Sequence, residues 1–268
     1  MGKKIKRGGI ICALGSCFAI EIRTLLSKDY DVRPREGRSY GLVWYNTYSI
    51  RYEFDRVYNG FKTNFDDCWE NKSSRPGWQE PSRRIVVAPT MAELRKMSAA
   101  LDREISYAIK PADIFVITLG MSETWRLKSS GLVACAHPQY GHRGRSGGVR
   151  ACEFHNASTA DNYKNLSHIC KLIAEHKPGV QVVFTVSPVP LNKTFTKMPL
   201  GRANAISKRK LRDAAIQVVS KYGFAHYFDS YEYCKSLPKR KCYQPDGRHV
   251  RPEVVKRVVR RFRERFCE

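Results

Sequence analysis

The chain has 268 residues, of which 42% are hydrophobic, enough to build one large domain or two small ones around a buried core. Its 48 lysines and arginines outnumber 25 aspartates and glutamates, and the net charge of +23 attracts polyanions such as nucleic acid or acidic polysaccharide, although a solvated basic surface has the same composition. No apolar stretch approaches the ~20 residues that span a bilayer, so the composition excludes a transmembrane helix.

The first seven residues, Met-Gly-Lys-Lys-Ile-Lys-Arg, are basic, and the apolar run behind them has only about six residues, fewer than a secretory signal needs. Lys6 occupies the position where a myristoylation motif requires Ser or Thr. We therefore expect a cytoplasmic location and no lipid anchor.

A strand, a glycine turn and a helix follow. Residues 10–14 form an apolar run that predicts a buried parallel strand, which Gly15 ends. Ser16 and Cys17 fall in the turn, where a small nucleophile would lie at the carboxyl edge of a sheet and at a helix N-terminus, whose free N–H groups favour negative charge. A plain small-residue turn has the same pattern. The helix is predicted from the spacing of Phe18, Ile22, Leu25 and Leu26.

Strands and helices alternate along the rest of the chain. Further strands are predicted at 30–32, 85–88, 113–119, 180–186 and 224–228. Helices are predicted at 50–57, at 94–109 behind a capping box of Thr90 and Glu93, and at 158–173, 211–222 and 252–266. Residues 59–83 read as a long loop or lid, and residues 139–151 as a flexible basic loop. This alternation predicts one doubly wound α/β domain over 1–268, with a mainly parallel sheet and ligands at the carboxyl ends of its strands.

The nine cysteines include no Cys-x-x-Cys pair, which favours buried thiols in a reducing compartment over disulfides. Several potential ligands lie close together in the sequence, but their spacing matches no standard zinc site, and we predict no metal. These residues are Cys135, His137, His142, Cys152 and His155.

Residues 246–249 read Asp-Gly-Arg-His, just before Pro252 opens the final helix. An aspartate three residues before a histidine can orient the imidazole, which then serves as a general base. The pattern is common by chance, but combined with an early strand-turn nucleophile it predicts catalytic roles for Asp246 and His249.

With these motifs the chain resembles the GSCFA family, which is similar to the SGNH/GDSL hydrolases. The resemblance implies a flavodoxin-like α/β/α sandwich that acts on esters, often O-acyl groups on carbohydrates. The matching motifs, in family order, are Gly15-Ser16-Cys17-Phe18-Ala19, Asn46-Thr47-Tyr48-Ser49-Ile50, Thr118-Leu119-Gly120 with Trp125, Cys135-Ala136-His137, Thr185-Val186-Ser187-Pro188-Val189, Asn204 with Ser207-Lys208, Ser230-Tyr231-Glu232, and Asp246 to His249.

In the SGNH enzymes that the chain resembles, a glycine N–H and the side chain of an asparagine two residues later complete the oxyanion hole. Gly120 matches the glycine, but Ser122 stands where the asparagine is expected. Either Ser122 or Asn46 would then be the second donor, although Asn46 is equally suited to a turn. His137 matches a family histidine and is either a substrate-binding or a structural residue.

Two residues compete as nucleophile. If Gly15-Ser16 ends the strand, Ser16 attacks; if the register follows Gly-Asp-Ser of the GDSL enzymes, Cys17 attacks. We favour Cys17, because a thiol at a helix N-terminus near His249 should have a depressed pKa. The remaining alternative is Cys17 as a small buried hydrophobic residue.

The resulting expectation is a Cys/Ser-His-Asp enzyme that hydrolyses or transfers an O-acyl group, with acetyl the favoured acyl group and a carbohydrate the favoured substrate. It needs no cofactor, unless acyl-CoA is the donor of a transferase. The alternative is a catalytically inactive module that binds a polyanion through its basic surface, on residues 143–150 and the outer face of helix 252–266. That face carries Lys256, Arg257, Arg260, Arg261, Arg263 and Arg265.

Overall fold

Five parallel strands form the main sheet, in the order β12-β11-β6-β1-β2. The computed structural model describes residues 4–35, 42–73, 76–138 and 144–268. The strands of the main sheet are β1 (Ile10–Gly15), β2 (Asp31–Arg33), β6 (Ile114–Leu119), β11 (Gln181–Val186) and β12 (Ala225–Phe228). If these five strands are numbered one to five along the chain, they lie side by side in the order 2-1-3-4-5. This is a doubly wound arrangement, in which the direction of the strand order reverses between β1 and β6. The predicted parallel α/β fold is confirmed.

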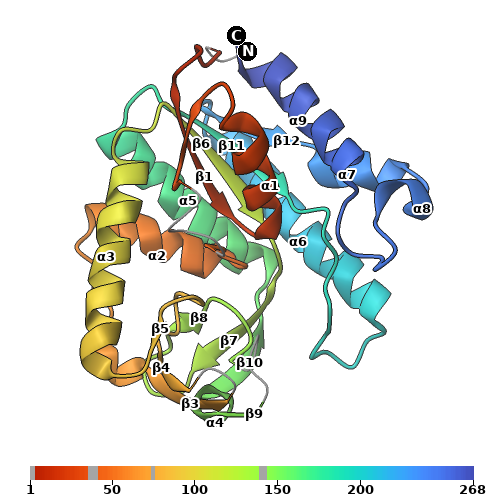
Figure 1. The fold of residues 1–268 in the computed structure, drawn as a ribbon. Helices are drawn as coiled ribbons and strands as arrows, with labels where there is room; N and C mark the ends of the chain where they lie inside the picture. The colour runs from red at the N-terminus through yellow and green to blue at the C-terminus, as the bar shows by residue number, and fades with distance from the viewer. Residues whose placement is uncertain (1–3, 36–41, 74–75, 139–143) are drawn as a thin grey trace.

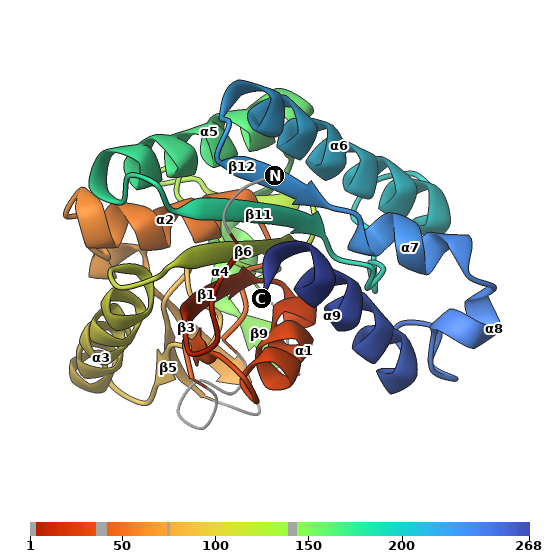
Figure 2. The ribbon, with the colours of Figure 1, turned by 90° about the horizontal axis from the view of Figure 1, so that it is seen from above.

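Helices cover both faces of this sheet, as the view in Figure 2 shows. On one face lie α1 (Cys17–Leu26) and α9 (Pro252–Phe266); on the other lie α2 (Thr47–Tyr58), α3 (Met91–Ile109), α5 (Thr159–His176) and α6 (Leu200–Lys221). Side chains alternate along β1, so that Ile11 and Ala13 enter the core under α1 and α9, while Cys12 and Leu14 enter the core under the other four helices. Because both faces of the main sheet are buried, successive residues of its strands are apolar rather than alternately apolar and polar.

The helix ends follow signals in the sequence. Thr90 and Glu93 form a capping box at the start of α3, and Ser158 and Asp161 form one at the start of α5. Pro252 opens α9, whose valine and phenylalanine stripe is buried as predicted.

Two small antiparallel sheets were not predicted. One has the order β10-β7-β8, with β7 (Glu123–Leu127), β8 (Val133–Ala134) and β10 (Cys152–Asn156); the other has the order β5-β4-β3-β9, with β3 (Trp69–Ser73), β4 (Gly77–Gln79), β5 (Val87–Ala88) and β9 (Gly144–Ser146). Figure 1 shows both beyond the end of the main sheet where β6 runs into β7.

The loop predictions for residues 59–83 and 139–151 are therefore wrong where the structure describes them. The first range contains the short helix η1 (Phe65–Asp67) with β3 and β4, and the second contains β9 and α4 (Gly147–Ala151), while 139–143 lie outside the described residues. These strands have five residues or fewer, and some of their pairing partners are distant in the sequence, as when Asn71 pairs with Ser146.

Two short helices, α7 (Ser230–Ser236) and α8 (Lys239–Cys242), complete the C-terminal part. Within the described ranges, no helix is long and apolar enough to cross a membrane.

Candidate active site

The predicted nucleophile turn lies at the carboxyl end of β1, where the strand order of the main sheet reverses. Gly15 has φ +131°, and a Cβ there would lie 2.1 Å from the Thr118 carbonyl oxygen of β6, so only glycine fits. The Ser16 N–H donates to the same oxygen at 3.0 Å. The chain therefore leaves β1 in close contact with β6, at the point of reversed strand order near which doubly wound folds bind ligands.

Gly120 directly follows β6 and lies against the nucleophile turn. A Cβ at Gly120 would lie 2.6 Å from the Tyr45 carbonyl oxygen and 3.1 Å from Cβ of Ser16. The Met121 N–H donates to the same Tyr45 oxygen at 2.8 Å, and the Trp44 N–H donates to the Gly15 carbonyl at 2.7 Å. The segment before α2 thus joins the ends of β1 and β6.

Cys17 is more accessible than Ser16. Ser16 is 2% exposed, and its hydroxyl has no hydrogen-bond partner among the described residues, whereas Cys17 is half-buried. The other eight cysteines are buried, and all nine are free thiols. Accessibility therefore favours the thiol over the hydroxyl as the group that meets a substrate.

The prediction of a depressed Cys17 pKa is wrong in direction. Burial raises the pKa of Cys17 above its ordinary value, and this outweighs the opposing effects of Lys208, Arg248 and the N–H groups of Cys17 and Phe18 at the start of α1. The sequence indicated that Cys17 lies at a helix N-terminus, but it did not indicate how deeply the side chain is buried. The resting side chain at neutral pH is therefore the thiol, and a base must remove its proton.

Lys208, in α6, is the residue of this site that the sequence analysis did not single out as functional. It is 1% exposed, and its Nζ donates to the Gly120 carbonyl at 2.7 Å. Burial lowers the pKa of Lys208 to about 7, and the neighbouring Cys17 acts in the opposite direction. The sequence did contain a signal that Lys208 is buried. Lys208 lies three residues before Leu211 and therefore on the apolar face of the predicted helix.

Asp246 and His249 face each other in a hairpin closed by the bridge between Tyr243 and Val250. Asp246 Oδ2 bonds to His249 Nδ1, and Asp246 Oδ1 accepts from the N–H groups of Arg248 at 2.9 Å and His249 at 3.0 Å. The bonds from the Arg248 N–H and then from the His249 ring and N–H lower the pKa of Asp246 to about 2. The carboxylate thus stays charged near neutral pH and holds the imidazole through Nδ1.

The His249 side chain is 59% exposed, so the dyad lies at the surface. Because Nδ1 is engaged with Asp246, Nε2 is the nitrogen left to take a proton from a substrate or nucleophile. The charge of Arg248, next to His249, acts electrostatically on the Cys17 thiol, but among the described residues no hydrogen bond joins His249 to Cys17.

The two proposed side-chain oxyanion donors have other partners. Asn46 accepts from the Ser49 N–H, as the cap of α2, and its Nδ2 lies 2.8 Å from the Ala134 carbonyl and 3.2 Å from the Cys135 carbonyl. The Ser122 hydroxyl donates to Asn156 Oδ1 at 3.2 Å. These contacts do not support an oxyanion role for either side chain: Asn46 joins the start of α2 to β8, and Ser122 joins the segment after β6 to β10.

His137 lies in an aromatic cluster rather than at the nucleophile turn. Its ring stacks on Phe195 at 4.4 Å between centroids and meets Trp125 edge-on at 4.8 Å. Glu123 holds this loop by accepting from the Phe195 N–H at 2.9 Å. Burial and then the charge of Lys193 lower the pKa of His137, so it is neutral at neutral pH.

A family model described as the GSCFA family matches residues 10–262. The chain belongs to the GSCFA family. No curated protein matches this GSCFA chain.

Solved structures of carbohydrate esterases resemble the GSCFA chain distantly. A variant of an acetyl-xylooligosaccharide esterase from Geobacillus Stearmophilus is 15% identical, with 98% of this chain and 95% of that chain covered and a TM-score of 0.40. A family 3 carbohydrate esterase of Clostridium thermocellum is 10% identical, with 98% and 94% covered and a TM-score of 0.36. An acetyl xylan esterase from the rumen bacterium Butyrivibrio proteoclasticus is 12% identical, with 98% and 64% covered and a TM-score of 0.41.

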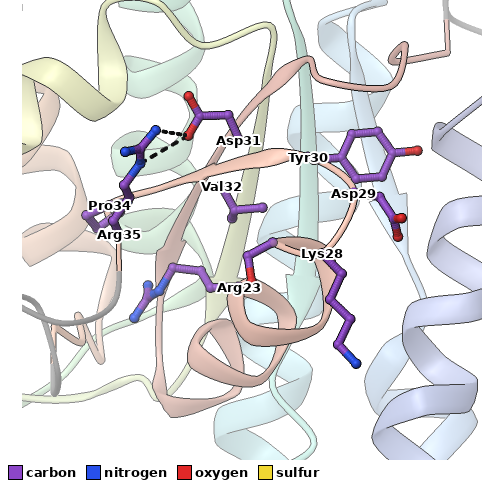
Figure 3. Close-up of a pocket in the computed structure, with 9 residues that line it drawn as sticks. Arg23, Lys28, Asp29, Tyr30, Asp31, Val32, Pro34 and Arg35 are labelled. Carbon is purple, nitrogen blue, oxygen red and sulfur yellow. Dashed lines mark hydrogen bonds and ion pairs between the residues drawn. The ribbon is translucent and has the colours of Figure 1, made fainter.

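Two surface cavities lie outside the nucleophile turn. One of about 550 Å³ surrounds the turn from α1 to β2, at the opposite end of the sheet from Cys17. Figure 3 shows Arg35 and Asp31 paired on its wall, and none of the candidate catalytic residues lines it. The other, of about 560 Å³, lies between α6 and α7, beyond the carboxyl ends of β11 and β12.

Within the part of the chain that the structure describes, no three His, Cys, Asp or Glu side chains gather as metal ligands. Of the residues considered for zinc, the Cys135 thiol donates to the Val43 carbonyl at 3.2 Å, and His142 lies outside the described residues.

Proposed function

We propose that this GSCFA protein is an enzyme that cleaves or transfers an O-linked acyl group, with Cys17 as nucleophile and the Asp246–His249 dyad as its base. The observation that carries the proposal is the pairing of Asp246 with His249 Nδ1 in a hairpin whose Arg248 acts on Cys17. Nucleophilic acyl transfer requires an accessible nucleophile, for which a thiol at a helix N-terminus is suited, and an oriented imidazole that can reach it.

In the proposed reaction, His249 Nε2 takes the proton from the Cys17 thiol as the sulfur attacks the acyl carbon. The N–H groups of Cys17 and Gly120 face the oxygen that becomes negative. His249 then returns the proton to the leaving alkoxide, and the alcohol departs from a thioester on Cys17. Water or an acceptor hydroxyl, deprotonated by His249, attacks this thioester and restores the thiol. The substrate class we propose is an acetylated carbohydrate.

The purified protein should release p-nitrophenol from p-nitrophenyl acetate and acetate from acetylated oligosaccharides. His249→Ala should lose about 10³-fold or more in kcat/KM, since it removes the imidazole that Asp246 orients. Adding acetyl-CoA and a sugar acceptor distinguishes the two reactions: acetylated sugar identifies a transferase, and free acetate a hydrolase. Equal activity in the unchanged protein and in His249→Ala would contradict the proposal.

A second candidate function, binding of an anionic ligand, is favoured by the cavity between α6 and α7. Its wall carries four cations and one carboxylate, Glu232, which already pairs with Arg212 at 2.9 Å. The cations are Arg202, Arg209, Arg212 and Lys235. This excess of positive charge suits a phosphate-bearing or acidic polymeric ligand.

Two arginines of the predicted basic face of α9 form ion pairs within the protein. Arg261 pairs with Asp229 at 3.1 Å, and Arg263 pairs with Asp29 at 2.7 Å. The remaining charge of that face is exposed and is carried by Lys256, Arg257, Arg260 and Arg265.

Duplex DNA should bind weakly at low salt, and its affinity should fall steeply with added salt as counterions are released. Arg202→Ser with Arg209→Ser should weaken binding and reduce the salt slope by about two, because each lost phosphate contact removes ~0.9 from it. The triple serine variant of Lys256, Arg257 and Arg260 tests the α9 face in the same titration. If neither variant changes the slope, these surfaces do not bind the polyanion.

A further inference from the structure

Two exposed phenylalanines lie together on the surface of the protein. Phe154, on β10, is 39% exposed, and Phe195, in the segment between β11 and α6, is 36% exposed. Their ring centroids are 6.2 Å apart. The structure describes all 12 phenylalanines of the chain, and the others are buried or half-buried. Exposed apolar side chains that gather in one place mark a binding surface more often than single ones do.

Two further rings support this pair. Trp125, on β7, is the cross-strand partner of Phe154, with 6.0 Å between the ring centroids, and it meets Phe195 edge-on at 5.0 Å. The His137 ring stacks on Phe195. The aromatic cluster is made up of these four residues, Trp125, His137, Phe154 and Phe195. Among the described residues, the two ring contacts of Phe154 are tilted by 57° and 36° rather than stacked, which leaves a face of this exposed ring open to a ligand.

A buried carboxylate fixes the position of Phe195. Glu123 is 2% exposed and accepts from the Phe195 N–H at 2.9 Å and from the Thr194 hydroxyl at 2.6 Å. The same hydroxyl oxygen accepts from the Thr196 N–H at 3.1 Å. These bonds hold the ring at the surface before any ligand arrives, so binding costs little conformational freedom.

The aromatic cluster lies at the edge of the main sheet that carries the nucleophile turn. Trp125 comes five residues after Gly120, a stretch that spans at most about 18 Å. Phe195 belongs to the segment after β11, where the Ser187 N–H donates to the Leu119 carbonyl, next to Gly120, at 2.8 Å. Both segments leave the main sheet where β6 ends (Figure 1). We therefore expect an extended ligand on the cluster to reach toward the nucleophile turn.

The size of the aromatic cluster suits a single ring rather than a protein partner. The exposed parts of Phe154 and Phe195 amount to on the order of 150 Å², because a whole aromatic side chain presents about 150–250 Å². Each partner in a stable protein complex buries roughly 800 Å². A sugar ring has an apolar C–H face that matches one aromatic ring. Its hydroxyl groups need partners, and the exposed Lys193, with Nζ 5.0 Å from the Phe195 centroid, offers N–H donors.

We propose that the aromatic cluster binds a sugar ring of the substrate, with Phe154 stacking on the ring and Lys193 donating to its hydroxyl groups. The inference rests on the proposed function, in which the acyl group of a carbohydrate is brought to Cys17. Phe154 then determines the preference for carbohydrate esters over simple esters and takes no part in the chemistry.

Isothermal titration calorimetry with unacetylated oligosaccharides tests binding without relying on activity. The probes are cellohexaose, xylohexaose and mannohexaose, which carry no ester and are not consumed. At least one should bind to the unchanged protein at millimolar concentration or below. Phe154→Ala should weaken this binding about 5- to 10-fold through the loss of the stacking contact, and Phe154→Tyr should retain it. Because these sugars are neutral, their affinity should not fall with added salt as that of a polyanion does.

Tyr107→Ala is the matched control, because it removes an exposed aromatic ring from α3 and leaves the aromatic cluster intact. It should leave the affinity unchanged. With an acetylated oligosaccharide as substrate, Phe154→Ala should raise KM by the same factor as it raises Kd. Its kcat/KM for ethyl acetate, which carries no sugar, should equal that of the unchanged protein.

The proposal is overturned if none of the three oligosaccharides binds, or if Phe154→Ala binds them as tightly as Tyr107→Ala does. Circular dichroism checks the fold of each variant. If Phe154→Ala does not fold, Lys193→Met replaces it in the comparison, and an unchanged affinity has the same meaning. A dimer of the unchanged protein that dissociates in Phe154→Ala would also overturn the proposal, because the cluster would then join two copies of the chain. Failure of the proposed function differs: sugar binding depends on Phe154, but no ester is cleaved.

Discussion

Cys17→Ala should abolish ester cleavage, with kcat falling by about 10⁴-fold or more, because the thioester intermediate cannot form. The same substitution should remove iodoacetamide labelling of that peptide. The structure sharpens this expectation, since Cys17 is the accessible thiol among nine and lies at the N-terminus of α1. The measurement is the steady-state rate with p-nitrophenyl acetate, together with mass spectrometry of the labelled peptide.

Ser16→Ala is the matched control, because Ser16 is the competing nucleophile one residue away. Its hydroxyl is buried and lacks a hydrogen-bond partner among the described residues, so its removal should leave a measurable rate. Full activity in Cys17→Ala, with none in Ser16→Ala, would reverse the assignment. Activity should be lost in His249→Ala under either assignment, since both nucleophiles require the same base.

Glu53→Gln should lower the free energy of unfolding at pH 7 by about 1–3 kcal/mol, because Arg83 loses its buried carboxylate partner and keeps only the half-exposed Asp102, at 2.7 Å. Glu53 and Arg83 are fully buried and paired through both carboxylate oxygens, with Nε to Oε1 at 2.8 Å. Glu53 also accepts from Trp44 Nε1 at 2.8 Å. The backbone N–H of Trp44 donates to the Gly15 carbonyl, so the ion pair, through the Trp44 side chain, also supports the nucleophile turn.

The stability difference should depend on pH. Burial alone would raise the pKa of Glu53, but Arg83 and Arg56, with the hydrogen bonds from Arg83 and Trp44, leave it below its ordinary value. A carboxyl with a lowered folded pKa stabilises the fold above its unfolded pKa of about 4.3, and this contribution is lost as pH falls through the folded value. The difference between the unchanged protein and Glu53→Gln should therefore shrink below about pH 4.

Denaturant unfolding of both proteins at pH 7 and at lower pH measures this difference. Glu153→Gln, on the exposed side of β10, is the control and should change stability by less than about 0.5 kcal/mol. A loss in Glu53→Gln no larger than in this control would show that the buried pair contributes nothing to the fold.

The sequence determined the layered core because its signals are local. Continuous apolar runs such as 114–119 are buried on both sides and predict parallel strands, and two predicted helix starts carry capping boxes. The Asp246–His249 contact was equally predictable, because a short turn brings both side chains together without help from the rest of the chain. A feature that depends only on residues close together in the chain can therefore be predicted from the sequence.

Only the tertiary structure decided the accessory sheets and the electrostatics of the site. Strands such as β3 and β9 are short, and they pair because the fold brings together segments 75 positions apart, such as Asn71 and Ser146. Likewise, the Cys17 pKa depends on burial and on charges from α6 and the C-terminal hairpin, which no local pattern contains. Burial and long-range charge are properties of the packed chain, so the direction of that shift and the place of Lys208 emerge only once the helices lie on the sheet.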